Sequence, residues 1–203
     1  MTQYAPQGFK MLPTVVKNLL IINVIVFLAT MVLERYGYAN ITSMCALNAI
    51  PTGRFRIWQL FTYMFMHASI EHIFFNMFAL WMFGYVLENF WGSRRFLFYY
   101  LVCGIGAGLC NLLVPGWGIT VGASGAVYGI LLAFGMTFPN ERIYLYFLMP
   151  IKAKWFVIGY AALELMEGLF RSADGVAHFA HLGGMLFGLL LILYWRKHPF
   201  SRF

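Results

Sequence analysis

Long apolar runs alternate with short polar segments along almost the whole chain. Six such runs stand out, and we place them at Thr14–Leu33, Ile73–Phe90, Phe96–Val114, Val121–Phe138, Trp155–Phe170 and Val176–Trp195. A helix of roughly 20 apolar residues crosses the hydrocarbon core of a bilayer, and a segment in lipid must satisfy its own backbone hydrogen bonds. The pattern therefore predicts an all-α membrane protein, with six spanning helices in one domain over residues 1–203.

One long connection separates the first two runs, from Glu34 to about Glu71. Apolar and aromatic residues are mixed with arginines in this connection, which favours short amphipathic pieces in the bilayer interface over a free loop. The other connections are short, so neighbouring helices are expected to run antiparallel. The first run lacks a clear small-x-small cleavage site, and we interpret it as a span rather than a cleavable signal.

Composition supports the membrane class. Hydrophobic residues make up 62% of the sequence and charged residues 10%, and the mean hydropathy is +0.74. A soluble domain carries roughly a quarter charged residues, so a soluble globular protein is excluded. The length of 203 residues leaves no room for a soluble module beside six spans.

The positive charges predict the orientation of the spans. With six spans the two termini share a side, and that side holds most of the Lys and Arg; the other side holds Arg35, Arg54, Arg56 and Arg171. Basic residues concentrate on the cytoplasmic side of membrane proteins, so we expect both termini in the cytoplasm and a location in the cell (inner, cytoplasmic) membrane. The basic residues form no clustered face, which argues against a nucleic-acid partner.

A serine opens the fourth run, which begins at the outer side as Gly122-Ala123-Ser124-Gly125. Counted from Val121, Ser124 would lie about 5 Å into the helix. The glycines leave its hydroxyl uncrowded, and a helix N-terminus favours developing negative charge. The string alone is weak evidence, because serine among small residues commonly serves helix packing.

A histidine occupies the matching position in the sixth run. Counted from Val176, His181 would lie about 8 Å into its helix. Each of the two runs carries glycines four residues apart, namely Gly125 with Gly129 and Gly184 with Gly188. Two such faces let helices approach closely, which would bring the His181 imidazole to the Ser124 hydroxyl for proton transfer.

Two further polar residues lie near the outer end of the second run. His72 and Asn76 are four residues apart and therefore share one helical face. Side-chain donors aimed together into a cavity are what an oxyanion hole requires. The alternative is an interfacial histidine beside an asparagine that bonds a neighbouring helix.

An acid that would orient His181 is not evident from the sequence. Asp174 lies in the loop before the sixth run, Glu164 and Glu167 lie near the outer end of the fifth, and Glu88 lies near the inner end of the second. We therefore expect a Ser–His dyad without a third residue. The fifth run, which is short and holds two carboxylates, is a candidate lateral gate.

These residues, in this order, resemble the motifs of the bacterial rhomboid proteases over essentially all six runs. The matching strings are His72-x-x-x-Asn76 with His67 before it, Gly122-x-Ser124-Gly125, and Ala180-His181-x-x-Gly184. Tyr128 matches the family's aromatic residue beside the catalytic imidazole, and Glu88 matches the end of the second span. Where the family often has Trp-Arg in its first loop, this chain has Trp58-Gln59, which puts only a structural contact of that loop in doubt.

The resemblance implies an intramembrane serine endopeptidase that cleaves transmembrane segments of membrane proteins. Ser124 would be the nucleophile and His181 the base, with His72, Asn76 and the Ser124 backbone N–H around the oxyanion. Tyr128, Gly122 and His67 would support the site. No cofactor or metal is implied, His178 has no place in the motif and is expected to be structural, and the oligomeric state stays open.

Two alternatives remain. A non-proteolytic rhomboid-like protein that binds transmembrane helices would be expected to lack Ser124 or His181, and both are present. A metal-dependent membrane protein would use the histidines, but the sequence shows no carboxylate or Cys convincingly beside them. The histidines in question are His67, His72, His178 and His181.

Overall fold

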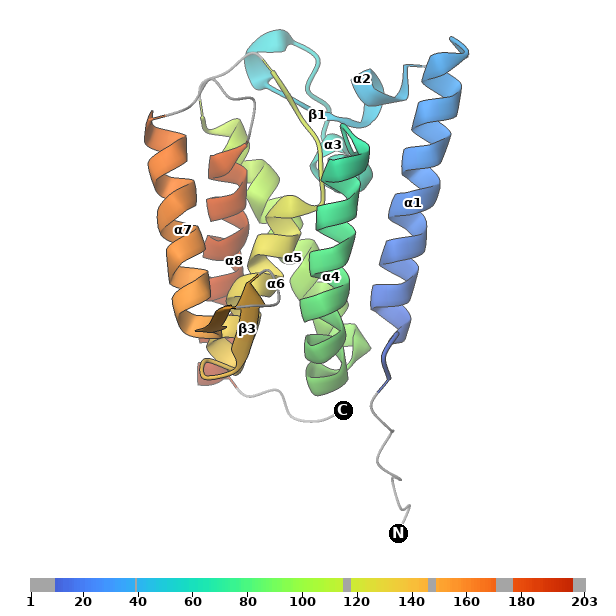
Figure 1. Cartoon of the computed structure of the whole chain (residues 1–203). Helices are drawn as coiled ribbons and strands as arrows, with labels where there is room; N and C mark the ends of the chain where they lie inside the picture. Colours follow the sequence, from blue (N-terminus) through green and yellow to red (C-terminus); the bar gives the residue numbers. More distant parts are fainter. Residues whose placement is uncertain (1–9, 39, 115–117, 146–148, 171–176, 199–203) are drawn as a thin grey trace.

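The structure, a computed structural model, describes residues 10–38, 40–114, 118–145, 149–170 and 177–198. Within these residues, six helices of 14 to 22 residues stand side by side as a bundle (Figure 1). They are α1 (Thr14–Arg35), α4 (Ile70–Trp91), α5 (Ser93–Leu112), α6 (Ser124–Thr137), α7 (Ala153–Phe170) and α8 (His178–Lys197). Helices α1 and α7 form opposite edges of the bundle in this view, and α1 begins at the same end at which α8 finishes.

The described helices include four that are long and apolar enough to cross a membrane, namely α1, α4, α5 and α8. Helix α6 is apolar but has only 14 residues. Helix α7 has 18 residues and carries Lys154, Glu164 and Glu167. The chain is therefore a multi-pass helical membrane protein, as predicted, whereas the number of six crossings stays a prediction.

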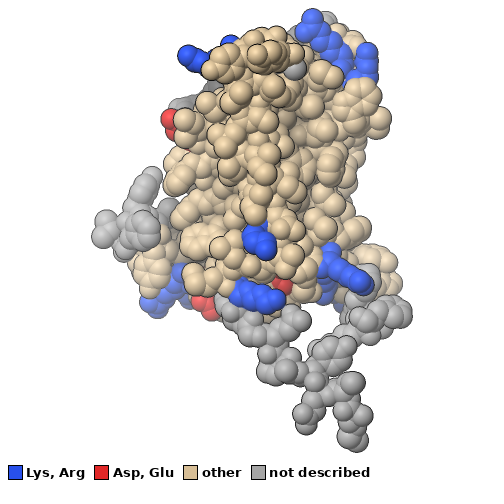
Figure 2. Space-filling model, turned by 90° about the vertical axis from the view of Figure 1, so that its right-hand side faces the viewer, with Lys and Arg blue, Asp and Glu red and all other residues tan. Residues whose placement is uncertain are grey.

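Apolar side chains cover the outside of the bundle. On α1, the residues Ile21, Ile25 and Leu28 are 49%, 59% and 54% exposed. Figure 2 shows that Lys and Arg gather toward the two ends of the face it displays, with a broad, largely uncharged band between them. Water would penalise such a surface by roughly 25 cal/mol per Å² of apolar area, whereas hydrocarbon chains would cover it without that penalty.

Helices α6 and α8 pack with their backbones in contact. A Cβ atom added at Gly184 of α8 would overlap the backbone carbonyl of Gly125 in α6. Both glycines belong to the predicted small-residue faces, and the predicted close approach of these two helices is confirmed. The other glycine of each face also lies against α5, which packs beside both helices: the Tyr99 hydroxyl of α5 donates a hydrogen bond to the Gly129 carbonyl at 2.8 Å.

The fourth helix starts a few residues later than the sequence pattern alone suggests. The pattern extends the helix from about Val121, but α6 begins at Ser124, because Gly122 has a φ of +126° and cannot continue a right-handed helix. The predicted start of the sixth helix, Val176, lies outside the described residues, and α8 is described from His178.

The long connection between α1 and α4 contains short ordered pieces, as predicted. These are α2 (Ile41–Cys45), β1 (Leu47–Asn48), the 3-10 helix η1 (Ile50–Thr52), α3 (Gln59–Thr62) and the 3-10 helix η2 (Tyr63–Phe65). Strand β1 pairs antiparallel with β2 (Ile119–Thr120), the strand just before α6. The connection thereby reaches the segment that carries Ser124. Its place in the bilayer interface stays a prediction.

Gln59 organises this connection. Its side chain is 1% exposed, and its Oε1 accepts hydrogen bonds from the backbone N–H groups of Asn48 and Arg56 at 3.2 and 3.1 Å. Its Nε2 donates to the carbonyls of Met44 and Arg54 at 3.2 and 3.3 Å. The residue at which the chain departs from the family pattern therefore ties four backbone positions together, consistent with a structural rather than a chemical role.

Two antiparallel strands, which the sequence analysis missed, lie between α6 and α7 in the sequence. Strands β3 (Arg142–Leu145) and β4 (Met149–Lys152) pair antiparallel, with Ile143 opposite Ile151. The connection was expected to be merely short. Strands of four residues show too little alternation to be distinguished from a loop by pattern alone.

Glu88 connects three helices at the other end of the bundle. Its carboxylate accepts hydrogen bonds from the backbone N–H groups of Val15 and Val16, at 2.9 and 2.7 Å, and from the Ser93 hydroxyl at 2.7 Å. The first N–H groups of a helix lack partners within the helix, so a carboxylate of α4 caps α1 and also meets the start of α5. Glu88 is 2% exposed, so water cannot replace it.

We predict that Glu88→Ala destabilises the bundle. Removing the carboxylate leaves buried donors of α1 unpaired, which costs about 2 kcal/mol. The free energy of unfolding, followed by thermal or denaturant unfolding in detergent micelles, should fall by that amount. Glu141→Ala, which removes an exposed carboxylate, is the control and should leave it unchanged. Equal stability of the two variants would contradict the capping role.

Candidate active site

Ser124 is the first residue of α6. Gly122 before it donates its backbone N–H to the Tyr63 carbonyl at 2.9 Å, and its positive φ turns the chain from β2 into the helix. Ser124 thus lies at the helix N-terminus itself rather than about 5 Å below it. There the unpaired N–H groups and the positive end of the helix dipole favour negative charge.

His181 lies beside Ser124. The His181 Nε2 atom is 2.8 Å from the Ser124 Oγ atom, across the contact between α8 and α6. His181 is 8% exposed. The structure therefore brings the two predicted residues into hydrogen-bonding contact, although His181 lies one turn from the described start of α8 rather than about 8 Å into it.

Tyr128 packs on the imidazole of His181. The two rings are stacked, with centroids 4.3 Å apart and an interplanar angle of 7°. Tyr128 follows Ser124 by four residues, so one helical face presents both to His181. This is the position that the resemblance assigned to Tyr128.

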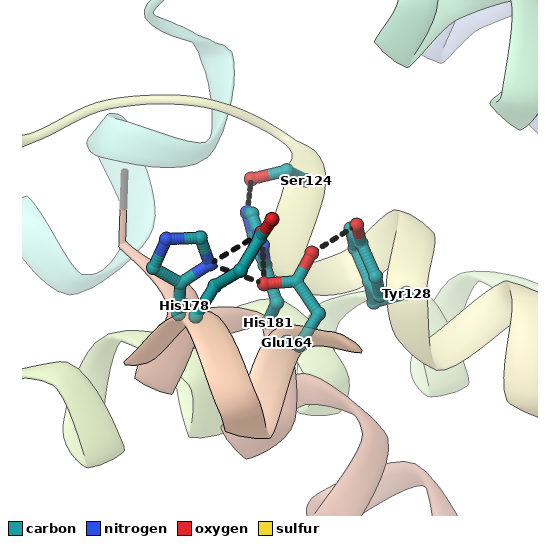
Figure 3. Close-up of polar contacts among 6 residues, drawn as sticks. Ser124, Tyr128, Glu164, His178 and His181 are labelled. Carbon is teal, nitrogen blue, oxygen red and sulfur yellow. Dashed lines mark hydrogen bonds and ion pairs between the residues drawn. The ribbon is translucent and has the colours of Figure 1, made fainter. Parts of the chain in front are cut away.

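An acid stands beside His181, so the expectation of no such residue is wrong. Glu164 of α7 places its Oε2 2.9 Å from His181 Nδ1 and 2.8 Å from His178 Nδ1 (Figure 3). Its Oε1 accepts a hydrogen bond from the Tyr128 hydroxyl. The only sequence signal was an ionisable residue inside an apolar run, which is by default a functional candidate in a membrane protein. The rotation of α7 that points Glu164 inward was not visible in the sequence.

His178 shares the Glu164 carboxylate and is 4% exposed. Its Nδ1 is also 3.7 Å from the carboxylate of Glu167, whose side chain is 42% exposed. His178 therefore belongs to the polar cluster around His181 rather than to a separate structural position. Asp174, the other acid considered, lies outside the described residues.

His72 and Asn76 approach Ser124 from α4. A Cβ atom added at Gly122 would lie 2.7 Å from His72 Nε2, so the ring packs directly against the backbone before Ser124. The Ala68 N–H points at His72 Nδ1 at 3.4 Å, which leaves the proton on Nε2, the nitrogen facing the site. Asn76 donates one amide N–H to the His72 carbonyl at 2.9 Å.

His67 lies behind His72. Its ring meets that of His72 edge to face, with centroids 5.1 Å apart. Burial, with a smaller contribution from His72, lowers the pKa of His67 to about 4, so its imidazole is neutral at pH 7. His67 therefore supports the ring of His72 without adding a charge.

Several of these groups line one cavity of about 800 Å³, whereas Tyr128, Glu164 and His178 do not. Its wall includes Ser124, His181, His72 and Asn76, and it continues toward α1 along Phe27, Thr30 and Met31. A hydroxyl, an imidazole and two side-chain donors around one hollow are the parts needed for acyl transfer. Glu164 lies behind His181, outside the cavity wall.

A bundle of apolar helices around a partly buried Ser–His pair defines a helical membrane protein with the side chains of a serine hydrolase. The sequence matches the Rhomboid domain over residues 54–198, and the chain belongs to the rhomboid family, as the resemblance indicated.

Relatives occur in distant organisms. Rhomboid-like protease 3 of Toxoplasma gondii is 27% identical over 177 residues, covering 86% of this chain and 66% of that protein. RHOMBOID-like protein 1 of Arabidopsis thaliana is 32% identical over 164 residues, covering 80% and 39%. Rhomboid protease GluP of Bacillus subtilis is 30% identical over 158 residues, covering 75% and 29%. The chain thus spans from 29% to 66% of the length of these relatives.

We predict that Gly122→Ala slows covalent modification of Ser124 by a fluorophosphonate about 10²-fold, the effect expected if the His72 N–H, predicted to hold the oxyanion, is displaced. A methyl group at position 122 meets the His72 ring at 2.7 Å and strains a backbone with φ of +126°, so the His72 ring must move. Gly118→Ala is the control, because its Cβ meets no atom within 4 Å. Equal labelling rates of the two variants would refute the close packing of His72.

Proposed function

We propose that this protein is an intramembrane serine endopeptidase that cleaves transmembrane segments of other membrane proteins. The observation that carries the proposal is the 2.8 Å contact of Ser124 Oγ with His181 Nε2, in a cavity inside an apolar helical bundle. A hydroxyl is a weak nucleophile until a base accepts its proton, and an imidazole nitrogen at this distance is such a base.

The reaction proceeds in two acyl-transfer steps. Ser124 Oγ attacks the carbonyl carbon of the peptide bond, its proton passes to His181 Nε2, and the carbonyl electron pair moves onto oxygen. When the tetrahedral intermediate collapses, the C–N bond breaks and His181 returns the proton to the leaving amine. Water, activated by the same imidazole, then hydrolyses the acyl-enzyme. The cavity provides the room for the peptide and the water.

His72, Asn76 and the backbone N–H of Ser124 stabilise the oxyanion. His72 directs Nε2 toward Gly122 and Ser124, and Asn76 keeps a second amide N–H beyond the one it donates to the His72 carbonyl. Donors fixed in place before the reaction act strongly in a site that excludes bulk water.

The substrate is a membrane helix that unwinds locally near the outer leaflet. An intact helix hides its carbonyls in intrachain hydrogen bonds, so only an unwound segment reaches Ser124. The bundle crosses the cell membrane six times with both termini in the cytoplasm, which places the cavity toward the outer side.

We predict that Ser124→Ala and His181→Ala each lower cleavage of a labelled transmembrane substrate in proteoliposomes by more than about 10³-fold, because each removes one half of the activated nucleophile. Appearance of the cleaved fragment over time is the measurement. His198→Ala, which removes an exposed histidine just beyond α8, is the control and should cleave normally. Normal cleavage by Ser124→Ala would contradict the proposal. Substrate binding without cleavage by the wild type would favour the non-proteolytic alternative.

We predict a smaller effect at the oxyanion donors. His72→Ala and Asn76→Ala should each lower kcat about 10²-fold and change KM little, because these donors meet the oxygen only when it becomes charged. The kinetic constants are measured with the same substrate. A rise in KM at constant kcat would instead assign the two residues to substrate binding.

A metal-dependent reaction is the second candidate, favoured by one observation. Ligand atoms of Glu164, His178 and His181 lie within 4.8 Å of one another, so a carboxylate does stand beside the histidines, contrary to the sequence analysis. The Oε2 atom lies 2.8 and 2.9 Å from the two Nδ1 atoms, which are hydrogen-bond distances. Cleavage abolished by a chelator and restored by Zn²⁺ would support the metal reaction over the serine mechanism.

A further inference from the structure

The Ser124–His181 reaction leaves one buried charge without a role. Glu164 is 6% exposed and lies inside the bundle, on the side of His181 that faces away from Ser124. A carboxylate in such surroundings is costly and persists only when other groups compensate it. Its position behind the imidazole therefore needs an explanation beyond packing.

The contacts of Glu164 determine which protons its neighbours carry. An ionised carboxylate only accepts hydrogen bonds, so His181 and His178, whose Nδ1 atoms lie 2.9 and 2.8 Å from Oε2, must each carry a proton on that nitrogen. A neutral His181 with its proton on Nδ1 has a free electron pair on Nε2. Nε2 is the atom 2.8 Å from Ser124 Oγ, so this tautomer is the one that accepts the serine proton.

We propose that Glu164 is a positioning residue for the reaction, which holds His181 in its Nδ1–H form and stabilises the imidazolium that forms when Ser124 gives up its proton. The proposal rests on the proposed function, because it assigns Glu164 a part in the Ser124–His181 reaction. Glu164 does not take up a proton itself. It remains a carboxylate while His181 gains and then returns the proton.

Two neighbours hold the Glu164 carboxylate in this position. The Tyr128 hydroxyl bonds Oε1, while the ring of Tyr128 stacks on His181, so a single side chain aligns both groups (Figure 3). His178 donates to Oε2 from the other side. With three hydrogen bonds the buried charge is compensated before the reaction begins, and the carboxylate need not rotate when His181 becomes positive.

Close packing of α7 fixes the position of Glu164 along the axis of the bundle. A Cβ atom added at Gly168 of α7 would lie 3.2 Å from the His178 Cβ of α8. One added at Gly135 of α6 would lie 2.7 Å from the side chain of Val157 on α7. Helix α7 thus packs against both helices that carry the reacting residues. The orientation of His181 therefore depends on how α7 packs against α6 and α8.

The competing explanation is that the hydrogen bonds of Glu164 only hold α7 against α8. A purely structural contact of this kind affects stability and substrate entry, whereas a positioning residue affects the chemical step and the tautomer of His181. Glu164→Gln distinguishes these roles, because it keeps the shape and the acceptor oxygen of the side chain and removes the charge. Glu167→Gln is the matched control: it makes the same change three residues along the same helix, at a side chain 42% exposed and without a contact to His181 among the described ones.

The experiment compares the wild type, Glu164→Gln and Glu167→Gln in proteoliposomes, with thermal unfolding of each protein as a check of its fold. We expect kcat to fall at least about tenfold for Glu164→Gln while KM changes less than about twofold, and both constants to stay within about twofold for Glu167→Gln. A folded Glu164→Gln with wild-type kcat overturns the proposal. So does an equal loss of kcat in the two variants.

A measurement on the wild-type protein keeps the test valid if Glu164→Gln does not fold. In protein labelled with ¹⁵N-histidine, we expect the His181 resonances to show a proton on Nδ1 and a low-field, hydrogen-bonded signal for it, assigned by its loss in His181→Ala. A proton on Nε2 instead overturns the proposal. A different result would contradict the proposed function: Ser124→Ala would be as active as the wild type, while the tautomer of His181 would be unchanged.

Discussion

The contact between Gly125 of α6 and Gly184 of α8 is the constraint on which the site depends. No side chain fits between these two backbones, so the position of one helix along the other is fixed at the two glycines. Ser124 is the neighbour of Gly125, and His181 lies three residues before Gly184, which brings their side chains to 2.8 Å. In lipid, where apolar side chains gain little by leaving solvent, close backbone packing is a main source of helix association. The same force that holds the bundle together therefore sets the distance between the Ser124 hydroxyl and the His181 imidazole.

The surroundings of this contact fix the remaining geometry through groups distant in sequence. The pairing of β1 with β2 and the hydrogen bond from Gly122 to the Tyr63 carbonyl hold the turn before Ser124. Gln59 in turn holds the connection from which β1 comes. Where the resemblance often implies arginine, this chain has Gln59, and the neutral amide reaches four backbone groups without bringing a charge into a buried position. The loop thus acts on the site through backbone hydrogen bonds rather than by contact with the reacting atoms.

Much of this arrangement was predictable, because it follows from local patterns. The apolar runs gave the six long helices to within a few residues at most ends, and the glycine spacing gave the approach of α6 to α8. The start of α6 lies three residues later than about Val121, because the positive φ of Gly122 is a property of one residue inside an apolar run. Glu164 was missed for another reason: its contact with His181 depends on how α7 is rotated and how far it is shifted along α8, which no pattern within α7 records.

The position of the acid on α7 has a consequence for how the site is assembled. Ser124 and His181 lie on α6 and α8, which touch through glycines and cannot slide without a clash. Helix α7 carries three charged residues in 18 and is less suited to lipid than its neighbours. Its place beside α8 is stabilised in part by the bonds of Glu164 to His178 and His181. In the proposed reaction the same bonds orient His181, so an outward movement of α7 that admits a substrate helix would have to preserve them near Glu164 or restore them before Ser124 attacks. The position of α7 and the orientation of His181 are therefore linked through one carboxylate.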